Sequence, residues 1–364
     1  MAKKIFIAAT QQNDGKTTVS VGLIAALKKR FGRIGFIKPI GQRYLMEQGY
    51  KVDEDSVLIE EVFGIKCNIK DMSPVAIEKG FTERFIEKGA DENYARSIKE
   101  AYERVAGDND LVIIEGTGHA GVCSVFDLSN ATVARLLDTN VILISSGGVG
   151  KPIDEVMLNK ALLDKEGVRL AGVVVNKVLP EKYDRISKLV KKGLEKKGLG
   201  VFGVFPYKNV LDIPTMREIK DEVKIDSLYQ GANIDATAEH VLIGAMNVKD
   251  ALKFVKDKSL MIIPGDRDDM IESVCRLHAG RSKNGFRISG IILSGGLTPK
   301  RRSLKSLKKS GITTFATKED TYRIASRIHS MVVKLKPQDK DKIKIIVDMV
   351  EKYMDVDAVL SNLK

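Results

Sequence analysis

Short apolar runs alternate with helical patterns through the first half of the chain. Continuous apolar runs of this length predict buried strands. They lie at residues 5–9, 34–37, 111–114, 141–144 and 172–175. Apolar positions at helical spacing separate these runs. The helical patterns cover residues 18–30, 93–106 and 183–197. The alternation predicts an α/β fold: a parallel sheet with helices on both faces.

The second half repeats the pattern on a smaller scale. Three apolar runs, at residues 260–263, 288–293 and 313–316, predict a small α/β domain. The charged stretch 217–226 resembles a connector. Residues 340–363 keep apolar positions at helical spacing, which predicts an amphipathic terminal helix that packs on another surface, such as a second subunit.

These patterns divide the chain into three parts. We expect a first domain at residues 1–215, a second at 216–335 and a terminal helix at 336–364. A chain of 364 residues is long enough for two domains at about 150 residues each.

The segment 10–18 lies between the first strand and the first helix, where a phosphate-binding loop is expected. In this context Lys16 reaches the β- and γ-phosphates, Thr17 offers its hydroxyl to Mg²⁺, and Gly15 allows close backbone approach. The first position of the usual pattern is Thr10 rather than Gly. The expected nucleotide-binding residues of this loop are Thr10, Asp14, Gly15, Lys16, Thr17 and Thr18.

A second Gly-rich segment, residues 147–151, also follows a strand. Pro152 comes directly after its lysine and supplies neither a hydroxyl nor an N–H, but suits the first turn of a helix. We interpret this segment as a turn beside the site.

Two polar residues end other predicted strands. Glu115 follows the run 111–114, at the sheet edge where parallel sheets bind ligands, and its carboxylate suits Mg²⁺. Asn176 ends the run 172–175, and its amide could pair with an adenine edge or simply cap the strand. A guanine-reading pattern would require Asp at position 179, where Leu179 stands, so ATP is favoured over GTP.

The composition indicates which partners and which cellular compartment to expect. Lys and Arg total 60 against 48 Asp and Glu, giving a net charge of +12, but basic and acidic residues alternate along the predicted helices. We therefore do not expect nucleic-acid binding. The three scattered cysteines suggest neither disulfides nor zinc, no run is long enough to cross a membrane, and the start lacks a signal peptide. We expect a cytoplasmic protein.

Five features of the first half occur in a fixed order: the segments 10–17, 38–40 and 115–118, together with Asp55 and Asn176. In this order the first half resembles dethiobiotin synthetase. The resemblance implies that Lys38, like Lys16, faces the transferred phosphoryl group. It also implies that Asp55 joins Thr17 and Glu115 at the metal, and that Asn176 binds adenine. From the residues alone, Asp55 could be a helix-start carboxylate and Lys38 a surface lysine.

The second half carries Gly265-Asp266-Arg267 and Ser294-Gly295-Gly296, which look like the paired signatures of the DRTGG domain. Both halves together are similar to the N-terminal regulatory portion of long phosphotransacetylases. Since residues 1–364 leave no room for the acyltransferase domain, we do not expect acetyl transfer. Asp266 and Arg267 could form an anion pocket with the glycines or a local ion pair in a turn.

Three functions follow from these features. The first is a regulatory ATPase, hydrolysing ATP slowly or not at all, that senses nucleotide and relays its state to an effector or partner. The second is a synthetase that phosphorylates a carboxylate or carbamate acceptor, like dethiobiotin synthetase or cobyrinic acid a,c-diamide synthase. A partition-type ATPase is disfavoured because Gln11, Gln12 and Asn13 stand where its second lysine would. The resemblance also implies a homo-oligomer, such as a dimer across the nucleotide face.

Overall fold

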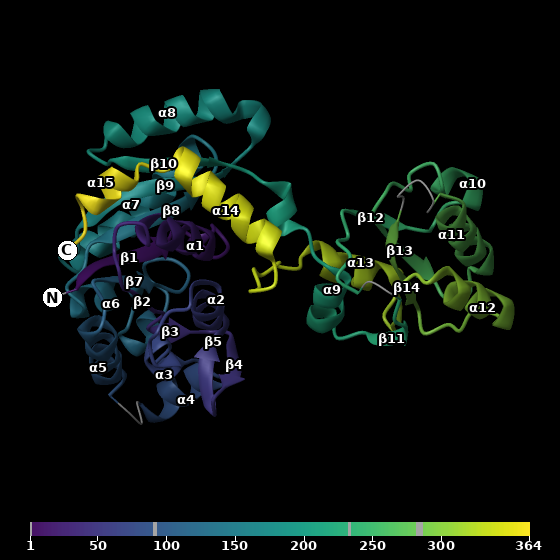
Figure 1. The fold of residues 1–364 in the computed structure, drawn as a ribbon, viewed down its shortest axis with the longest axis horizontal. Helices are drawn as coiled ribbons and strands as arrows, with labels where there is room; N and C mark the ends of the chain where they lie inside the picture. The colour runs from purple at the N-terminus through teal and green to yellow at the C-terminus, as the bar shows by residue number, and fades with distance from the viewer. Residues whose placement is uncertain (1, 90–92, 232–233, 282–286) are drawn as a thin grey trace. The chain divides into compact units, whose positions relative to one another are not determined.

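The computed structural model describes residues 2–89, 93–231, 234–281 and 287–364 (Figure 1). Contacts between residues divide the chain into two compact units. The first comprises Met1–Lys208 together with Leu335–Lys364, and the second is Asn209–Lys334. The last thirty residues thus return to the first unit, whereas the sequence pattern set residues 336–364 apart as a separate segment.

A six-stranded sheet forms the centre of the first unit, and all of its strand pairs are parallel. In spatial order the strands are β10 (Val201–Pro206), β9 (Leu170–Val178), β8 (Val141–Ser146), β1 (Lys3–Ala9), β7 (Leu111–Glu115) and β2 (Ile34–Ile37). Five of them are the strands predicted from apolar runs. The sixth, β10, was not predicted, because Gly203 interrupts its apolar sequence and Pro206 ends it.

Helices cover both faces of this sheet, as expected for the α/β class. The helices of the first unit are α1 (Lys16–Leu27), α2 (Glu54–Phe63), α3 (Ile69–Met72), α4 (Phe81–Lys88), α5 (Tyr94–Gly107), α6 (Asn130–Leu136), α7 (Gly150–Lys165), α8 (Tyr183–Glu195), α14 (Lys340–Tyr353) and α15 (Val356–Leu360). Two short pairs lie outside the sheet: β3 (Ile40–Gly41) with β6 (Val75–Ala76), and the hairpin β4 (Tyr44–Glu47) with β5 (Tyr50–Asp53). Among the described residues, no helix combines the length and apolarity needed to cross a membrane.

The C-terminal segment forms two helices rather than the single one that its spacing predicted. Met354 takes an extended conformation at the end of α14, and Asp355 begins α15 by capping Ala358 N. α14 packs against α1 and beside β10, where Met354 bridges to Gly203. The apolar face of the terminal helix is therefore covered by its own chain.

The second unit is a smaller α/β layer structure. Its sheet has the order β11 (Asp226–Tyr229), β15 (Thr314–Ala316), β14 (Ile288–Ser294), β13 (Ser259–Pro264) and β12 (His240–Ile243). Strands β12 to β15 are parallel, and β11 pairs antiparallel with β15. Separate apolar clusters lie on the two faces, beneath α10 (Val248–Ala251), α11 (Asp268–Arg281) and α12 (Arg301–Ser310) on one and α9 (Met216–Val223) and α13 (Thr321–His329) on the other.

One expectation for this unit was wrong. The stretch that looked like a connector contains helix α9, which begins with a capping box between Thr215 and Glu218. Its buried residues Met216, Ile219 and Val223 repeat at helical spacing, but the intervening charges obscured the pattern in the sequence.

Candidate functional site

The predicted phosphate loop lies between β1 and α1, at the carboxyl edge of the parallel sheet. Lys16 and Thr17 are the first two residues of α1, so the amino-terminal N–H groups of this helix face the loop. Thr17 Oγ1 donates to Glu115 Oε1 at 3.2 Å, which connects the loop to the end of β7. The structure thus brings together the predicted phosphate ligand, the hydroxyl and the carboxylate.

Asp14 and Thr10 organise the loop from inside. The Asp14 carboxylate accepts from Gln11 N at 2.8 Å and lies 2.8 Å from Thr10 Oγ1. Glu155, on α7, lies 3.1 Å from the same hydroxyl and accepts from Gln11 Nε2 at 2.6 Å. Burial raises the pKa of Asp14, opposed by its hydrogen bonds to Thr10 and Gln11. In this structure both predicted residues shape the loop, while Thr18, beside them, is partly exposed in the first turn of α1.

Asn176 fixes the other side of the loop. Its Nδ2 donates to the Asp14 carbonyl at 2.8 Å, and its Oδ1 accepts from Lys177 N at 2.9 Å. Gly15 has φ 102°, and a Cβ there would overlap Asn176 Nδ2, so both backbone and space require glycine. Both polar ends of the amide thus bond to the chain's own backbone. Adenine recognition by Asn176 stays a prediction.

Glu115 is held by two hydroxyls. It is 1% exposed, and besides Thr17 it accepts from Ser20 Oγ at 2.6 Å through Oε2. Ser20 lies one helical turn after Thr17 on α1, so the same helix face presents both donors. Burial, with the neighbouring Asp55 charge, raises the Glu115 pKa to about 6 despite opposition from Lys38, Ser20 and Lys16.

Lys38 lies next to Glu115 because it comes one residue after Ile37, which pairs with Ile114 across β2 and β7. Its ammonium donates to Asp55 Oδ2 and lies 3.0 Å from Asp53 Oδ1 and 3.6 Å from Glu115 Oε1. All four side chains are buried. The predicted residues Lys38, Asp55 and Glu115 therefore form one cluster, and Lys38 is not a surface lysine.

The two lysines have opposite pKa shifts. Burial lowers the pKa of Lys16 to about 8, with Lys38 adding repulsion and Glu115 opposing. For Lys38, burial also favours the neutral form, but Asp55, Glu115 and Asp53 together outweigh it and hold the pKa above its ordinary value. Lys38 therefore stays protonated, whereas the protonation of Lys16 depends on the charges around it.

The donor set suits Mg²⁺. The Thr17 hydroxyl and the carboxylates of Asp55 and Glu115 are oxygen ligands, which this hard cation prefers. Across the described ranges, no group of three or more His, Cys, Asp or Glu side chains is arranged to hold a metal by itself. Mg²⁺ commonly takes one or two carboxylates plus substrate phosphates, so these residues fit a metal that is bound together with a nucleotide.

Three residues of the site were missed by sequence reasoning. Asp53 touches Lys38 and caps α2, Ser20 holds Glu115, and Glu155 supports the loop. Only Asp53 carried a local signal, because an Asp just before an acidic first turn is typical of a helix N-cap. Ser20 and Glu155 reach the site through tertiary packing.

In the second unit, the first signature follows β13, and the second begins at Ser294, the last residue of the adjacent strand β14. Arg267 pairs with Asp269 at 2.9 Å and 3.0 Å and donates to the Met246 carbonyl at 3.2 Å. Arg267 thus forms a local ion pair, but with Asp269 rather than with Asp266. Ser294 Oγ lies 2.7 Å from Thr321 Oγ1, which joins the end of β14 to the start of α13.

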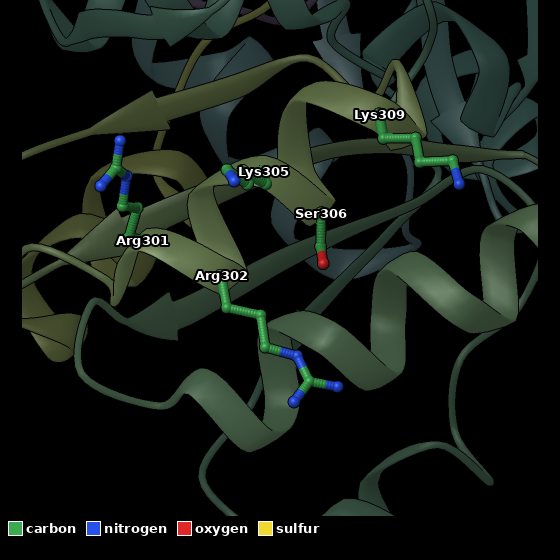
Figure 2. Close-up of a pocket in the computed structure, with 5 residues that line it drawn as sticks. All are labelled: Arg301, Arg302, Lys305, Ser306 and Lys309. Atoms are coloured by element: carbon green, nitrogen blue, oxygen red, sulfur yellow. The ribbon is translucent and has the colours of Figure 1, made fainter.

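A shallow depression of about 350 Å³ lies along α12 (Figure 2). The side chains that line it are Arg301, Arg302, Lys305, Ser306 and Lys309. Arg302 approaches Glu272 at 3.4 Å, so part of this positive charge is compensated by α11. The sequence pattern had not predicted this helix.

Comparison with protein families decides the classification. The family described as AAA domain matches residues 3–215, more than half of the chain. The chain belongs to this AAA domain family. The DRTGG domain family matches residues 218–331, so the AAA domain is followed by a DRTGG domain, as the paired signatures predicted.

The AAA and DRTGG domains together are similar to the N-terminal region of phosphate acetyltransferases. The protein of Nitratidesulfovibrio vulgaris is 26% identical over 376 residues, covering 100% of this chain and 52% of that protein. That of Synechocystis is 25% identical over 372 residues, with the same two coverages. The Escherichia coli protein is 20% identical over 390 residues, covering 99% and 53%. The chain spans about half the length of these relatives.

Solved structures show weaker likenesses. The MinC:MinD cell division complex of Aquifex aeolicus has a TM-score of 0.38 at 14% identity, covering 58% of this chain and 84% of that chain. The CBS and DRTGG domains of Clostridium perfringens pyrophosphatase have a TM-score of 0.29 at 18% identity, covering 39% and 64%.

Proposed function

We propose that this protein is a cytoplasmic Mg²⁺- and ATP-binding protein whose AAA domain senses nucleotide and relays its state to the DRTGG domain or a partner. The observation that carries the proposal is the placement of Lys16 and Thr17 at the start of α1, with Thr17 hydrogen-bonded to Glu115. Backbone N–H groups, an ammonium and a hydroxyl thereby converge at one sheet edge, which is the donor set of a nucleoside triphosphate site.

Each residue has a role in this proposal. Lys16 donates to the β- and γ-phosphate oxygens, and the α1 amino terminus supplies backbone donors. Thr17, Asp55 and Glu115 hold Mg²⁺, which neutralises phosphate charge when bound. Asn176 and Asp14 keep the loop in the receiving conformation through the contacts described above.

A second function, ATP-dependent phosphorylation of a carboxylate or carbamate, is favoured by one observation. Lys38 is buried beside Asp55 and Glu115, where it could stabilise charge on a transferred phosphoryl group. A regulator that only binds nucleotide does not require a second buried lysine. The two functions differ in the ATP turnover that they predict: negligible for the nucleotide sensor, and stimulated by an acceptor for the synthetase.

Calorimetric titration with MgATP, run alongside phosphate release, separates them. We expect binding with negligible turnover, alone and with a panel of amine and carboxylate metabolites. Strong stimulation of release by one metabolite would establish the synthetase and identify its acceptor. Absence of MgATP binding would refute both functions. The dimer implied by the resemblance stays a prediction, and light scattering on the same samples tests it.

The Lys16 pKa predicts how ATP affinity depends on pH. Phosphate charge favours protonated Lys16, so its pKa rises on binding from its free value of about 8. Below that value the lysine is already charged; above it, binding must take up a proton, and affinity falls as pH rises, by at most about tenfold per pH unit. Titrations between about pH 7 and pH 9.5 in buffers of different ionisation enthalpy measure both the affinity and the proton uptake. Constant affinity over this range would contradict the assignment of Lys16.

A further inference from the structure

The buried cluster around Lys38 contains more negative than positive side chains. Three carboxylates surround one ammonium: Asp55 accepts from it, Asp53 lies at 3.0 Å and Glu115 at 3.6 Å. The Lys38 side chain is 8% exposed, and those of the three acids are 5% exposed or less. Two of these acids, Asp55 and Glu115, are the carboxylates assigned above to Mg²⁺. The ammonium thus sits at the oxygens that the metal would use.

Asp53 differs from the other two acids in how firmly it is held. Its Oδ1 accepts from Asp55 N at 3.0 Å, which caps α2, and its backbone N donates to Ser73 Oγ at 3.0 Å. Gly41 packs so closely against it that a Cβ on Gly41 would lie 2.7 Å from Asp53 Cβ. Asp53 is therefore fixed by contacts that do not depend on Lys38, and it stays in place if the ammonium moves.

An ammonium and a divalent cation cannot both occupy these oxygens at low cost. Like charges about 4 Å apart repel strongly where water is largely excluded. Lys38 is covalently attached and already charged, so a free divalent cation in solution must displace it and lose its own hydration. A cation that arrives with nucleotide brings phosphate oxygens, which offer the displaced ammonium a new partner.

We propose that Lys38 is the resident counter-ion of the Asp55–Glu115 pair, keeping divalent cations out of the site until nucleotide phosphates arrive. Lys38 then shifts from Asp55 and Glu115 toward the phosphates while Asp53 retains it in the site. This assignment rests on the proposed ATP site and adds an order to it: metal enters with nucleotide. Asp53 acts as a positioning residue for Lys38.

The test is Mn²⁺ binding to the 364-residue chain without nucleotide, measured as the loss of the free-ion signal in electron paramagnetic resonance. The wild type is expected to bind no Mn²⁺ at this site. Lys38→Met removes the charge and keeps an unbranched side chain of similar length. It is expected to bind one Mn²⁺ with an affinity at least about 100-fold above the upper limit that the titration sets for the wild type. Lys51→Met, which removes an exposed ion pair to Glu78, is the matched control and is expected to behave as wild type.

Thermal unfolding gives a second readout. Removing Lys38 leaves three buried carboxylates without their cation, so the variant is expected to melt earlier in EDTA and to be stabilised specifically by Mn²⁺. Stoichiometric Mn²⁺ binding to the nucleotide-free wild type would overturn the proposal even if the variant failed to fold. Failure of Mn²⁺ to bind folded Lys38→Met would also overturn it. Neither measurement uses ATP, so the result is distinct from failure of the ATP titration.

Discussion

Replacing Lys16 with alanine is expected to abolish measurable MgATP binding, lowering affinity about 100-fold or more. The Lys16 ammonium would make charge-assisted hydrogen bonds to β- and γ-phosphate oxygens, each contributing roughly 1.5 to 3 kcal/mol. Because burial holds its pKa near 8, the lysine also gains charge stabilisation when phosphates bind. Calorimetric titration of wild type and Lys16→Ala measures the difference. The fold should be retained, because the ion pairs of the described residues at this site are formed by Lys38 and none includes Lys16.

The second Gly-rich turn supplies a matched control for this variant. Lys151 also follows a glycine after a parallel strand, but its side chain is exposed and pairs with Glu155 on its own helix at 3.5 Å. Lys151→Ala is expected to leave MgATP affinity within about twofold of wild type, as for other exposed side chains. Unchanged affinity in Lys16→Ala would refute the assignment of the phosphate loop. Loss of affinity in Lys151→Ala would move the site to the second turn.

The position of the proposed phosphate loop could be predicted from the sequence because the signal that marks it is local. A strand, a Gly-Lys-Thr segment and an apolar helix follow one another within residues 5–27, and the chemistry depends on that succession. Glu115 could also be located, since the end of a buried strand in a parallel sheet identifies the ligand edge. From the residues alone, Lys38 could have been a surface lysine and Asp55 a helix-start carboxylate. In the structure Lys38 is buried at this edge of the sheet, so it is not a surface lysine.

The contacts among the charged residues around Lys38 could not be predicted from the sequence, because they join segments that are distant in the chain. Asp53 and Lys38 are separated by the hairpin of β4 and β5, and only the closure of that hairpin brings them to 3.0 Å. Ser20 is a small polar residue within an apolar helix, and its partner Glu115 is 95 residues away. Contacts of this kind depend on tertiary packing rather than on local spacing.

The terminal helix shows the same limit. Its apolar spacing correctly predicted a helix with one buried face, but not which surface would cover it. The structure gives the reason at Gly22, in the middle of α1: a Cβ there would overlap Val350 and lie 3.3 Å from the Ile346 carbonyl. Glycine lets α14 approach the phosphate-loop helix closely. In the chain, α14 comes after the second unit, which contains the DRTGG domain. It therefore packs on α1, the helix that begins with Lys16, after the chain has left that unit.

Val350→Asp is expected to weaken the packing of α14 on α1 and to lower the free energy of unfolding of the first unit by about 4 kcal/mol, because the contact would bury a carboxyl group without a hydrogen-bond partner. Val350 is fully buried in the described structure. As the chain lacks Trp, circular dichroism during chemical denaturation is the suitable measurement. Lys344→Asp, an exposed exchange on the same helix, is expected to change stability by less than about 0.5 kcal/mol. Equal stability of the two variants would show that α14 does not pack on α1 in solution.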